Sequence, residues 1–275
     1  MSVGKELRLK RIFPSESNKT VIVPMDHGIT LGPIGELRNI ESCIKKVQQG
    51  GVNGVILHKG ILQKSYKALK AATGLIVHLN ASTALGRDIQ NKVSVCSVDE
   101  ALYLGADAVS IHINFGSAFE AEQIQFVANT AKECFMKRMP LMVMAYIASE
   151  DDAYNSQKIE HAARVALELG ADIIKCNYTG TINTFSQITA DSKVPILISG
   201  GPKMTNTIDL FNMVADAITA GAAGVAIGRN IFNDYYPEMI SYCISKIVHE
   251  SWSAQRAFGE LNNYIKKNKI REQTI

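Results

Sequence analysis

The chain has 275 residues, 47% of them hydrophobic and 20% charged, which provides for one large core and excludes a disordered chain. Its 29 basic and 26 acidic residues leave a net charge of only +3, which excludes a nucleic-acid partner but allows a local anion site. Because the sequence has neither a signal-peptide core nor a run of about 18 uncharged apolar residues, we expect a cytoplasmic protein with no membrane partner.

Short runs rich in valine and isoleucine recur along the chain, and a longer amphipathic stretch follows most of them. Such runs, bounded by glycine, asparagine or aspartate, are typical of buried parallel strands. Eight strands are predicted, at 20–25, 54–58, 75–79, 108–112, 141–145, 172–175, 195–199 and 224–228. A ninth piece, 93–95, is brief and precedes a predicted helix over 98–104.

Four predicted strands begin directly after a glycine that ends a helix, at Gly51, Gly105, Gly170 and Gly221. This is the short junction expected between the helix and the strand of repeated βαβ units. Eight such units predict the α/β class and a (β/α)8 TIM barrel, as a single domain over residues 1–275 with a carboxyl-terminal helical extension from about residue 244. The competing architecture, an open doubly wound sheet, usually has a G-x-G-x-x-G turn after its first strand, and that turn is absent.

The five cysteines lie far apart and form no Cys-x-x-Cys pair; they are Cys43, Cys96, Cys134, Cys176 and Cys243. This spacing indicates neither a zinc site nor a disulfide framework. We therefore expect reduced thiols, which suit the cytoplasm.

Lys175 stands at the carboxyl end of the sixth predicted strand, directly after Ile173 and Ile174. Lysine is seldom buried, and an ammonium group removed from water tends to release its proton. The neutral amine that results is a nucleophile able to form a Schiff base with a ketone. The alternative is a lysine that reaches the surface or pairs with a carboxylate.

Polar side chains follow the predicted strands at their carboxyl ends, where a barrel places its reacting groups. The candidates are Asp26, His27, His58, His78, His112, Tyr146, Lys175, Ser199 and Arg229. Four of the six histidines fall at these ends, although a histidine taken alone is more often structural. We expect Asp26 and Tyr146 to exchange protons during Schiff-base chemistry, which requires that the pKa values of both residues are shifted toward neutrality. Alternatively, Asp26 caps a helix and Tyr146 only packs.

Glycine-rich loops follow the seventh and eighth predicted strands, where barrels commonly bind phosphate. Glycine lets backbone N–H groups approach an anion closely, and an arginine can hold two phosphate oxygens at once. The predicted phosphate-binding residues are Ser199, Gly200, Gly201, Gly228 and Arg229, with His27 and His58 as further substrate-binding candidates. The alternative is that these glycines only end the strands.

The sequence resembles the class I aldolases of the barrel family that includes deoxyribose-phosphate aldolase and the archaeal-type fructose-bisphosphate aldolases. Within this family it is most similar to the subgroup of 2-amino-3,7-dideoxy-D-threo-hept-6-ulosonate synthases. The matching motifs extend from about Leu7 to His249 and surround Asp26, His58, His112, Lys175, Lys203 and Arg229.

The resemblance implies that Lys175 is the Schiff-base lysine, that Asp26 and Tyr146 act as acid and base, and that His112 lies in the active site. It also implies a lyase or transaldolase-type transferase with phosphosugar and aldehyde substrates, such as a ketose-phosphate donor and L-aspartate semialdehyde. The product would feed aromatic amino acid or aminohydroxybenzoate biosynthesis. The resemblance implies neither a metal nor an organic cofactor. Family members often form rings or stacked rings, so a homo-oligomer is expected.

The sequence departs from the family after Tyr146, where Ile147-Ala-Ser-Glu150 replaces the common Pro-Arg-Gly. This removes a cation from the place where a second substrate phosphate would bind, so fructose bisphosphate is less favoured. Class I fructose-bisphosphate aldolase stays an alternative, as does a phosphosugar-binding barrel without catalysis. An isomerase with Asp26 as its base would need the phosphate loops but would not need Lys175.

Overall fold

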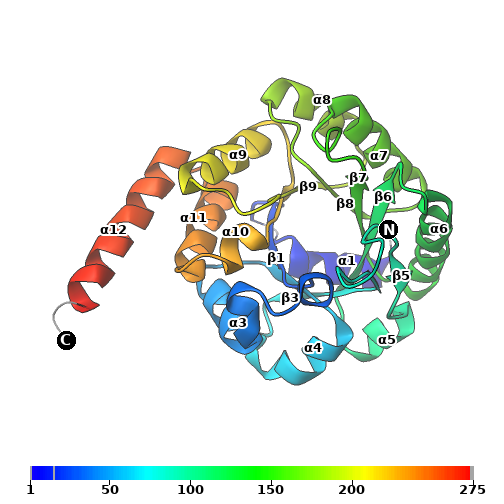
Figure 1. The fold of residues 1–275 in the computed structure, drawn as a ribbon, viewed down its shortest axis with the longest axis horizontal. Helices are drawn as coiled ribbons and strands as arrows, with labels where there is room; N and C mark the ends of the chain where they lie inside the picture. Colours follow the sequence, from blue (N-terminus) through cyan, green and yellow to red (C-terminus); the bar gives the residue numbers. More distant parts are fainter. Residues whose placement is uncertain (1, 15, 273–275) are drawn as a thin grey trace.

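The structure, a computed structural model, describes residues 2–14 and 16–272 and is built on a closed barrel of eight parallel strands (Figure 1). Around the barrel the strands follow the order β1-β10-β9-β8-β7-β6-β3-β2. They are β1 (Thr20–Pro24), β2 (Gly54–Leu57), β3 (Gly74–His78), β6 (Ala108–Phe115), β7 (Leu141–Ile147), β8 (Ile173–Cys176), β9 (Ile196–Ser199) and β10 (Gly224–Ala226). The predicted (β/α)8 barrel is confirmed, and the open sheet is excluded.

Helices surround the barrel as a ring in Figure 1. The longer ones are α3 (Ile40–Gln49), α6 (Glu120–Lys137), α7 (Ser156–Glu168), α8 (Ile182–Asp191), α9 (Thr207–Thr219) and α11 (Pro237–Glu250). Shorter segments are α2 (Gly28–Leu31), η1 (Gly35–Asn39), α4 (Lys59–Ser65), η2 (Tyr66–Ala68), α5 (Val98–Tyr103) and α10 (Arg229–Phe232). The glycines at the four predicted helix-to-strand junctions all adopt positive φ. No helix among the described residues is long and apolar enough to span a bilayer.

Two strands are longer than the sequence predicts. β6 and β7 pair over seven residues, from Val109 opposite Leu141 to Phe115 opposite Ile147. This pairing supplies backbone hydrogen bonds beyond the apolar runs, so the strands continue into polar sequence. As a result Asn114 and Tyr146 lie opposite each other inside strands rather than in loops.

The brief piece predicted at 93–95 contributes to a separate two-stranded ribbon outside the barrel. Here β5 (Val93–Ser94) pairs antiparallel with β4 (Asn80–Ala81). Both strands belong to the connection between β3 and β6, at the carboxyl end of β3. The ribbon therefore lies at the same end of the barrel as the predicted site residues.

The opposite, amino-terminal end of the barrel is covered by α1 (Val3–Ile12), which the sequence analysis did not predict. Ile12 is fully buried and packs with the side chains inside the barrel. The amine of Lys5 pairs with Asp172 at 2.8 Å, and a guanidinium nitrogen of Arg8 donates to the carbonyl of Ala106 at 2.6 Å. Asp172 and Ala106 precede β8 and β6, so α1 seals the end away from the candidate site.

The carboxyl-terminal region contains two helices separated at Ser251, which has a left-handed φ of 54°. Residue 244, where the extension was expected to begin, lies within α11, and α12 (Ala254–Glu272) follows the break. Ala257 and Leu261 are buried as α12 packs against α9 and α11. The rest of α12 points away from the ring of helices (Figure 1).

Alternation along the strands sets which side chains face the barrel interior. In β8, Ile173 packs inside the barrel, whereas Ile174 and Cys176 pack in the outer core beneath the helices. Successive side chains in a strand point to opposite faces, so Lys175 shares the interior face with Ile173. The same alternation applies to β1, β2 and β3, whose interior residues are Ile22, Ile56 and Ile76. Asp26, His58 and His78 follow these residues at an even spacing, so they continue the interior face.

We predict that Gly224→Ala lowers the free energy of unfolding because it disrupts the pairing of β1 with β10. Gly224 has a φ of 140°, and a Cβ there would lie 2.0 Å from the carbonyl oxygen of Thr20, which is rigid backbone. We expect a loss of about 3 kcal/mol or more in the free energy of unfolding, measured by urea denaturation. Gly105→Ala is the control, because Gly105 has a similar requirement for positive φ but open space around its Cβ, and should lose only about 1 kcal/mol. Equal losses in the two variants would contradict the steric explanation.

Candidate active site

A cavity of about 630 Å³ opens at the carboxyl ends of the strands, which is a usual size for a small-molecule site. It brings together all eleven residues predicted to act in catalysis or substrate binding. These are Asp26, His27, His58, His112, Tyr146, Lys175, Ser199, Gly200, Gly201, Gly228 and Arg229. His78 lines the same cavity, so the four histidines at the strand ends converge there.

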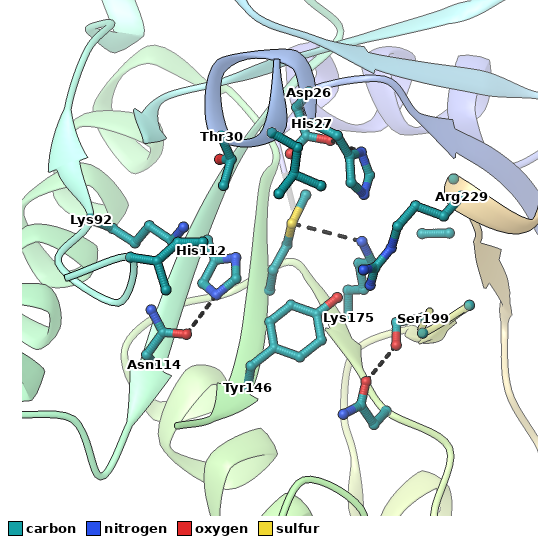
Figure 2. A pocket seen from close by; sticks show the side chains of 18 of the residues that line it. Asp26, His27, Thr30, Lys92, His112, Asn114, Tyr146, Lys175, Ser199 and Arg229 are labelled. Carbon is teal, nitrogen blue, oxygen red and sulfur yellow. Dashed lines mark hydrogen bonds and ion pairs between the residues drawn. The ribbon is translucent and has the colours of Figure 1, made fainter. Parts of the chain in front are cut away.

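Lys175 is only 6% exposed and extends from β8 into this cavity (Figure 2). Its amine lies 3.9 Å from the sulfur of Met144 and 5.8 Å from the centre of the Tyr146 ring. Among the described residues no carboxylate oxygen lies within 4.0 Å of this amine. Lys175 therefore neither pairs with a carboxylate of the described residues nor reaches bulk solvent, which excludes the alternative given in the sequence analysis.

Asp26 lies across the cavity from Tyr146 in Figure 2, directly after β1. Its Oδ1 is 3.5 Å from Nδ1 of His27, and its Oδ2 is 3.8 Å from Nε2 of His78. Burial by itself raises the pKa of Asp26, but His78, His27 and Lys175 together lower it below its ordinary value. The expected shift toward neutrality is therefore wrong, because the charges around the carboxyl group outweigh its burial. Asp26 is a carboxylate, and its buried Oδ1 accepts no hydrogen bond from the described residues.

The histidines of the cavity are neutral near pH 7. Burial lowers the pKa of His27 to about 4 and that of His78 and His112 to about 3, and it also lowers the pKa of His58. For His112 the positive charge of Lys92 is the second cause. Neutral imidazoles can position groups by hydrogen bonding without adding positive charge beside Lys175.

Tyr146 and His112 form one side of the cavity, from β7 and β6. Their rings lie 4.8 Å apart, and the hydroxyl end of Tyr146 points toward Lys175 and Arg229 (Figure 2). Nε2 of His112 is 2.8 Å from Oδ1 of Asn114, which fixes the imidazole plane. The extended pairing of β6 with β7 thus positions a phenol and an imidazole beside the lysine.

The glycine-rich loops after β9 and β10 form the opposite side. A Cβ on Gly200 would lie 2.7 Å from Ile227, and one on Gly228 would lie 2.7 Å from the carbonyl oxygen of Pro24, so side chains are excluded at both positions. Asn230, which is 1% exposed, joins the loops by donating to the carbonyls of Gly200 at 2.7 Å and Pro202 at 2.9 Å. Backbone is therefore exposed in a fixed shape beside Arg229.

Sequence reasoning assigned no role to three polar residues of the site. Asn177 accepts a hydrogen bond from Ser199 at 2.5 Å, and Asn230 joins the two glycine loops. Lys92 enters the cavity beside His112 (Figure 2); burial lowers its pKa, while the charge of Asp26 acts in the opposite direction. Asn177 and Asn230 stand next to predicted strand ends, whereas Lys92 precedes the brief predicted piece at 93–95, which lies outside the barrel.

Comparison with known proteins identifies the family. A family model described as DeoC/LacD family aldolase matches residues 20–234. The chain belongs to this family. The class I aldolase resemblance of the motifs is confirmed, and the protein is an aldolase.

Two curated relatives match nearly the full length of this aldolase. A 2-amino-4,5-dihydroxy-6-oxo-7-(phosphonooxy)heptanoate synthase of Streptomyces griseus is 38% identical over 90% of this chain and 91% of its own. A 2-amino-3,7-dideoxy-D-threo-hept-6-ulosonate synthase of Archaeoglobus fulgidus is 40% identical over 90% of this chain and 92% of its own.

A solved structure agrees with both the fold and the family. It is an archaeal fructose-1,6-bisphosphate aldolase whose catalytic lysine is covalently bound to the carbinolamine intermediate of the substrate. It is 32% identical to this chain, with a TM-score of 0.82, and the match covers 90% of this chain and 99% of that one.

We predict that the buried histidines make the fold acid-sensitive between about pH 6.5 and 3. Because their folded pKa values lie below the unfolded value of about 6.5, the unfolded chain binds more protons in this window and stability falls as pH falls. At pH 5.5 each such histidine costs about 1.4 kcal/mol relative to pH 7. Asp26, whose pKa is lowered, contributes only below about pH 4.

The measurement is urea unfolding at pH 7.0 and 5.5 for the wild-type chain and His112→Gln. The variant should lose about 1.4 kcal/mol less between the two pH values than the wild-type chain does. His161→Gln, which changes an exposed histidine on α7, should keep the wild-type pH dependence. Equal pH dependence in all three proteins would contradict the prediction.

Proposed function

We propose that this aldolase forms a carbon–carbon bond between a ketose-phosphate donor and L-aspartate semialdehyde, through a Schiff base on Lys175. The observation that carries the proposal is the buried amine of Lys175, which has no carboxylate partner and faces a cavity with a carboxylate, a phenol and an arginine. The covalently bound lysine of the archaeal aldolase structure supports the same role for Lys175.

The names of the two curated relatives support the choice of acceptor. Both name a seven-carbon acid with an amino group at C2 and a ketone at C6. An aldol reaction forms the bond between C4 and C5, because the C4 hydroxyl comes from the aldehyde and C5 is the carbon next to the ketone. Carbons 1 to 4 then derive from an aldehyde with an amino group and a carboxylate, which is aspartate semialdehyde. We propose the same 2-amino-6-oxoheptanoate skeleton as the product of this chain.

In the proposed mechanism the neutral amine of Lys175 attacks the donor ketone, and the ketone oxygen leaves as water. The resulting iminium withdraws electrons, so an enamine forms at the adjacent carbon. With glycerone phosphate that carbon loses a proton, whereas with a deoxyketohexose phosphate the bond from that carbon to the rest of the sugar breaks and a three-carbon aldehyde leaves. The enamine carbon attacks the carbon of the acceptor aldehyde, and the oxygen of this aldehyde takes up a proton to become the C4 hydroxyl. Water then hydrolyses the new iminium, which releases the ketone product and restores the amine.

We assign the proton transfers to Asp26 and Tyr146. Asp26 is ionised and its Oδ1 is free of hydrogen bonds, so it can accept the proton of the donor carbon, as a weaker base than a carboxylate of ordinary pKa. Tyr146, whose hydroxyl end points toward Lys175, suits the donation of a proton to the departing water or to the aldehyde oxygen. His112 is neutral and bonded to Asn114, so we assign it a hydrogen-bonding role toward substrate hydroxyls.

We assign the donor phosphate to the loops after β9 and β10. Gly200, Gly201 and Gly228 leave backbone accessible, and Arg229 adds the charge that a phosphate requires. The two relatives differ at C7, where one product has a phosphate and the other has none. Glycerone phosphate and a deoxyketohexose phosphate are therefore the two donors to compare. The cytoplasmic location and the ring-shaped or stacked homo-oligomer stay predictions.

We predict that borohydride reduction with glycerone phosphate traps a permanent mass adduct on Lys175, located by peptide mass spectrometry. Lys175→Met should abolish the adduct and lower kcat by at least about 10³-fold, because no other group forms the iminium. Lys64→Met, at an exposed position on α4, is the matched control and should keep both adduct and activity. Full activity in Lys175→Met would exclude the covalent mechanism. A wild-type chain that traps no ketose phosphate would favour the isomerase or the non-catalytic barrel.

We predict that Arg229→Met raises the concentration of glycerone phosphate that gives half-maximal borohydride trapping by about 30-fold, because a charge-assisted contact to phosphate is lost. Trapping of unphosphorylated dihydroxyacetone should change by less than about threefold, since that ketone makes no such contact. The measurement is the concentration dependence of borohydride trapping for each ketone. An equal loss for both ketones would place the donor phosphate elsewhere.

A further inference from the structure

Lys92 is a second lysine inside the active-site cavity, and the mechanism above gives it no role. It follows the loop between β4 and β5 and directly precedes β5, in the connection between β3 and β6. In Figure 2 it lies beside His112, on the side away from Arg229, with Lys175 between the two. Among the described residues, the cavity is lined by two basic side chains besides that of Lys175, namely Lys92 and Arg229.

The amine of Lys92 has a hydrogen-bond partner but no counter-ion. It donates to the hydroxyl of Ser82 at 2.7 Å, and that hydroxyl donates in turn to the carbonyl of Ile89 at 2.5 Å. Within residues 2–14 and 16–268, no carboxylate oxygen lies within 4.0 Å of the amine of Lys92. A partly buried cation without a counter-ion, facing a cavity, is suited to a ligand of negative charge.

The segment before Lys92 is held in place by three further hydrogen bonds at Gln90. The backbone carbonyl of Gln90 accepts from Asn114 at 3.0 Å and from Gln123 at 2.9 Å. Its side-chain amide donates to the carbonyl of Ala148, after β7, at 2.9 Å. Lys92 is therefore presented to the cavity by a fixed loop rather than by a free surface chain.

The barrel topology sets Lys92 opposite the proposed phosphate site. In the strand order, β9 is four places from β3, and β10 is four places from β6, which is half of the eight-stranded circle. The phosphate loops follow β9 and β10, whereas Lys92 belongs to the connection between β3 and β6. A chain with its phosphate at Arg229 and its ketone carbon at Lys175 would extend its other end toward Lys92.

We propose that Lys92 binds the carboxylate of the acceptor aldehyde and so selects an amino-acid aldehyde over an uncharged one. This inference rests on the proposed function, which defines the acceptor end of the cavity. A single ammonium group matches the single charge of a carboxylate. Glu150, which lines the same cavity after β7, adds a negative charge that suits the acceptor's ammonium group and opposes a phosphate dianion.

The test compares three four-carbon aldehydes with glycerone phosphate as donor. Aspartate semialdehyde has both charged groups, succinate semialdehyde has only the carboxylate, and butanal has neither. Lys92→Met should lower kcat/KM about 30- to 100-fold for the two carboxylate aldehydes, mainly through KM, and less than about threefold for butanal. Lys92→Arg should restore most of the loss, and Lys64→Met should behave as the wild-type chain.

Inhibition provides a second readout if butanal turns over too slowly. L-2-aminobutyrate, an unreactive analogue with the carboxylate, should compete with the acceptor in the wild-type chain better than its amide does, and Lys92→Met should abolish the difference. Equal losses for all three aldehydes would overturn the inference, since Lys92 would then act on the chemistry. Glyceraldehyde 3-phosphate serves as a fourth acceptor. If Lys92→Met lowers kcat/KM only for this aldehyde, the inference is overturned, because Lys92 would then bind a phosphate and not a carboxylate.

Failure of the underlying function looks different from failure of the inference. A wild-type chain that traps no donor, or that makes no product from aspartate semialdehyde, would refute the proposed function before any variant is compared. If the wild-type chain uses aspartate semialdehyde and Lys92→Met loses nothing, the function stands and the role of Lys92 is wrong. Donor trapping on Lys175 should be unchanged in Lys92→Met in either case.

Discussion

The site depends on one constraint, the alternation of side chains along strands that close into a barrel. Closure leaves no sheet edge and gives each strand an inner and an outer face, so every second side chain enters the interior. Apolar residues such as Ile173 fill the middle of the barrel, and the next inner position on β8 holds Lys175. Because all strands are parallel, these last inner positions meet at the same end. Chemistry is thus confined to one layer above a packed, dry core, and α1 seals the other end through Ile12 and Lys5.

Burial distributes charge within that layer unevenly. The imidazoles are neutral because the cost of desolvating a cation outweighs the attraction that Asp26 exerts on His27 and His78, and His112 has no such attraction. Asp26 keeps its charge because His78, His27 and Lys175 favour the carboxylate. The cavity therefore holds a buried carboxylate, Asp26, together with the cationic side chains of Lys92 and Arg229 on two of its sides. A neutral histidine shell also avoids surrounding Lys175 with positive charge while still supplying hydrogen bonds. Such an arrangement suits a reaction in which an iminium cation forms and disappears close to a carboxylate base.

Much of the barrel and of its central site could be predicted from sequence because both follow local patterns. The eight apolar runs identified the strands, and the residue that ends each run identified most of the polar layer, including Asp26 and Lys175. The length of β6 and β7 could not be predicted, since it depends on pairing between strands rather than on either sequence alone. The pKa of Asp26 likewise depends on neighbours from other strands. Lys92 was not predicted as a site residue because the connection that contains it shows no regular alternation of apolar and polar residues. Its sequence therefore does not indicate which of its side chains face the cavity.

Under the proposed roles, the residues assigned to the chemistry and those assigned to the choice of acceptor belong to different parts of the fold. Asp26, Tyr146 and Lys175 project from barrel strands or directly follow one, so moving them would disturb strand pairing and the core beneath. Lys92 and Glu150 lie in connections beyond β3 and β7, and these connections are joined by the bond from Gln90 to the carbonyl of Ala148. Charges there can change without altering the barrel. If these roles hold, a barrel of this kind can change its acceptor by substitution of residues in these connections while its Schiff-base centre stays the same. Under that view the substrate of a barrel aldolase is encoded mainly in residues outside its strands, where strand patterns give the least information.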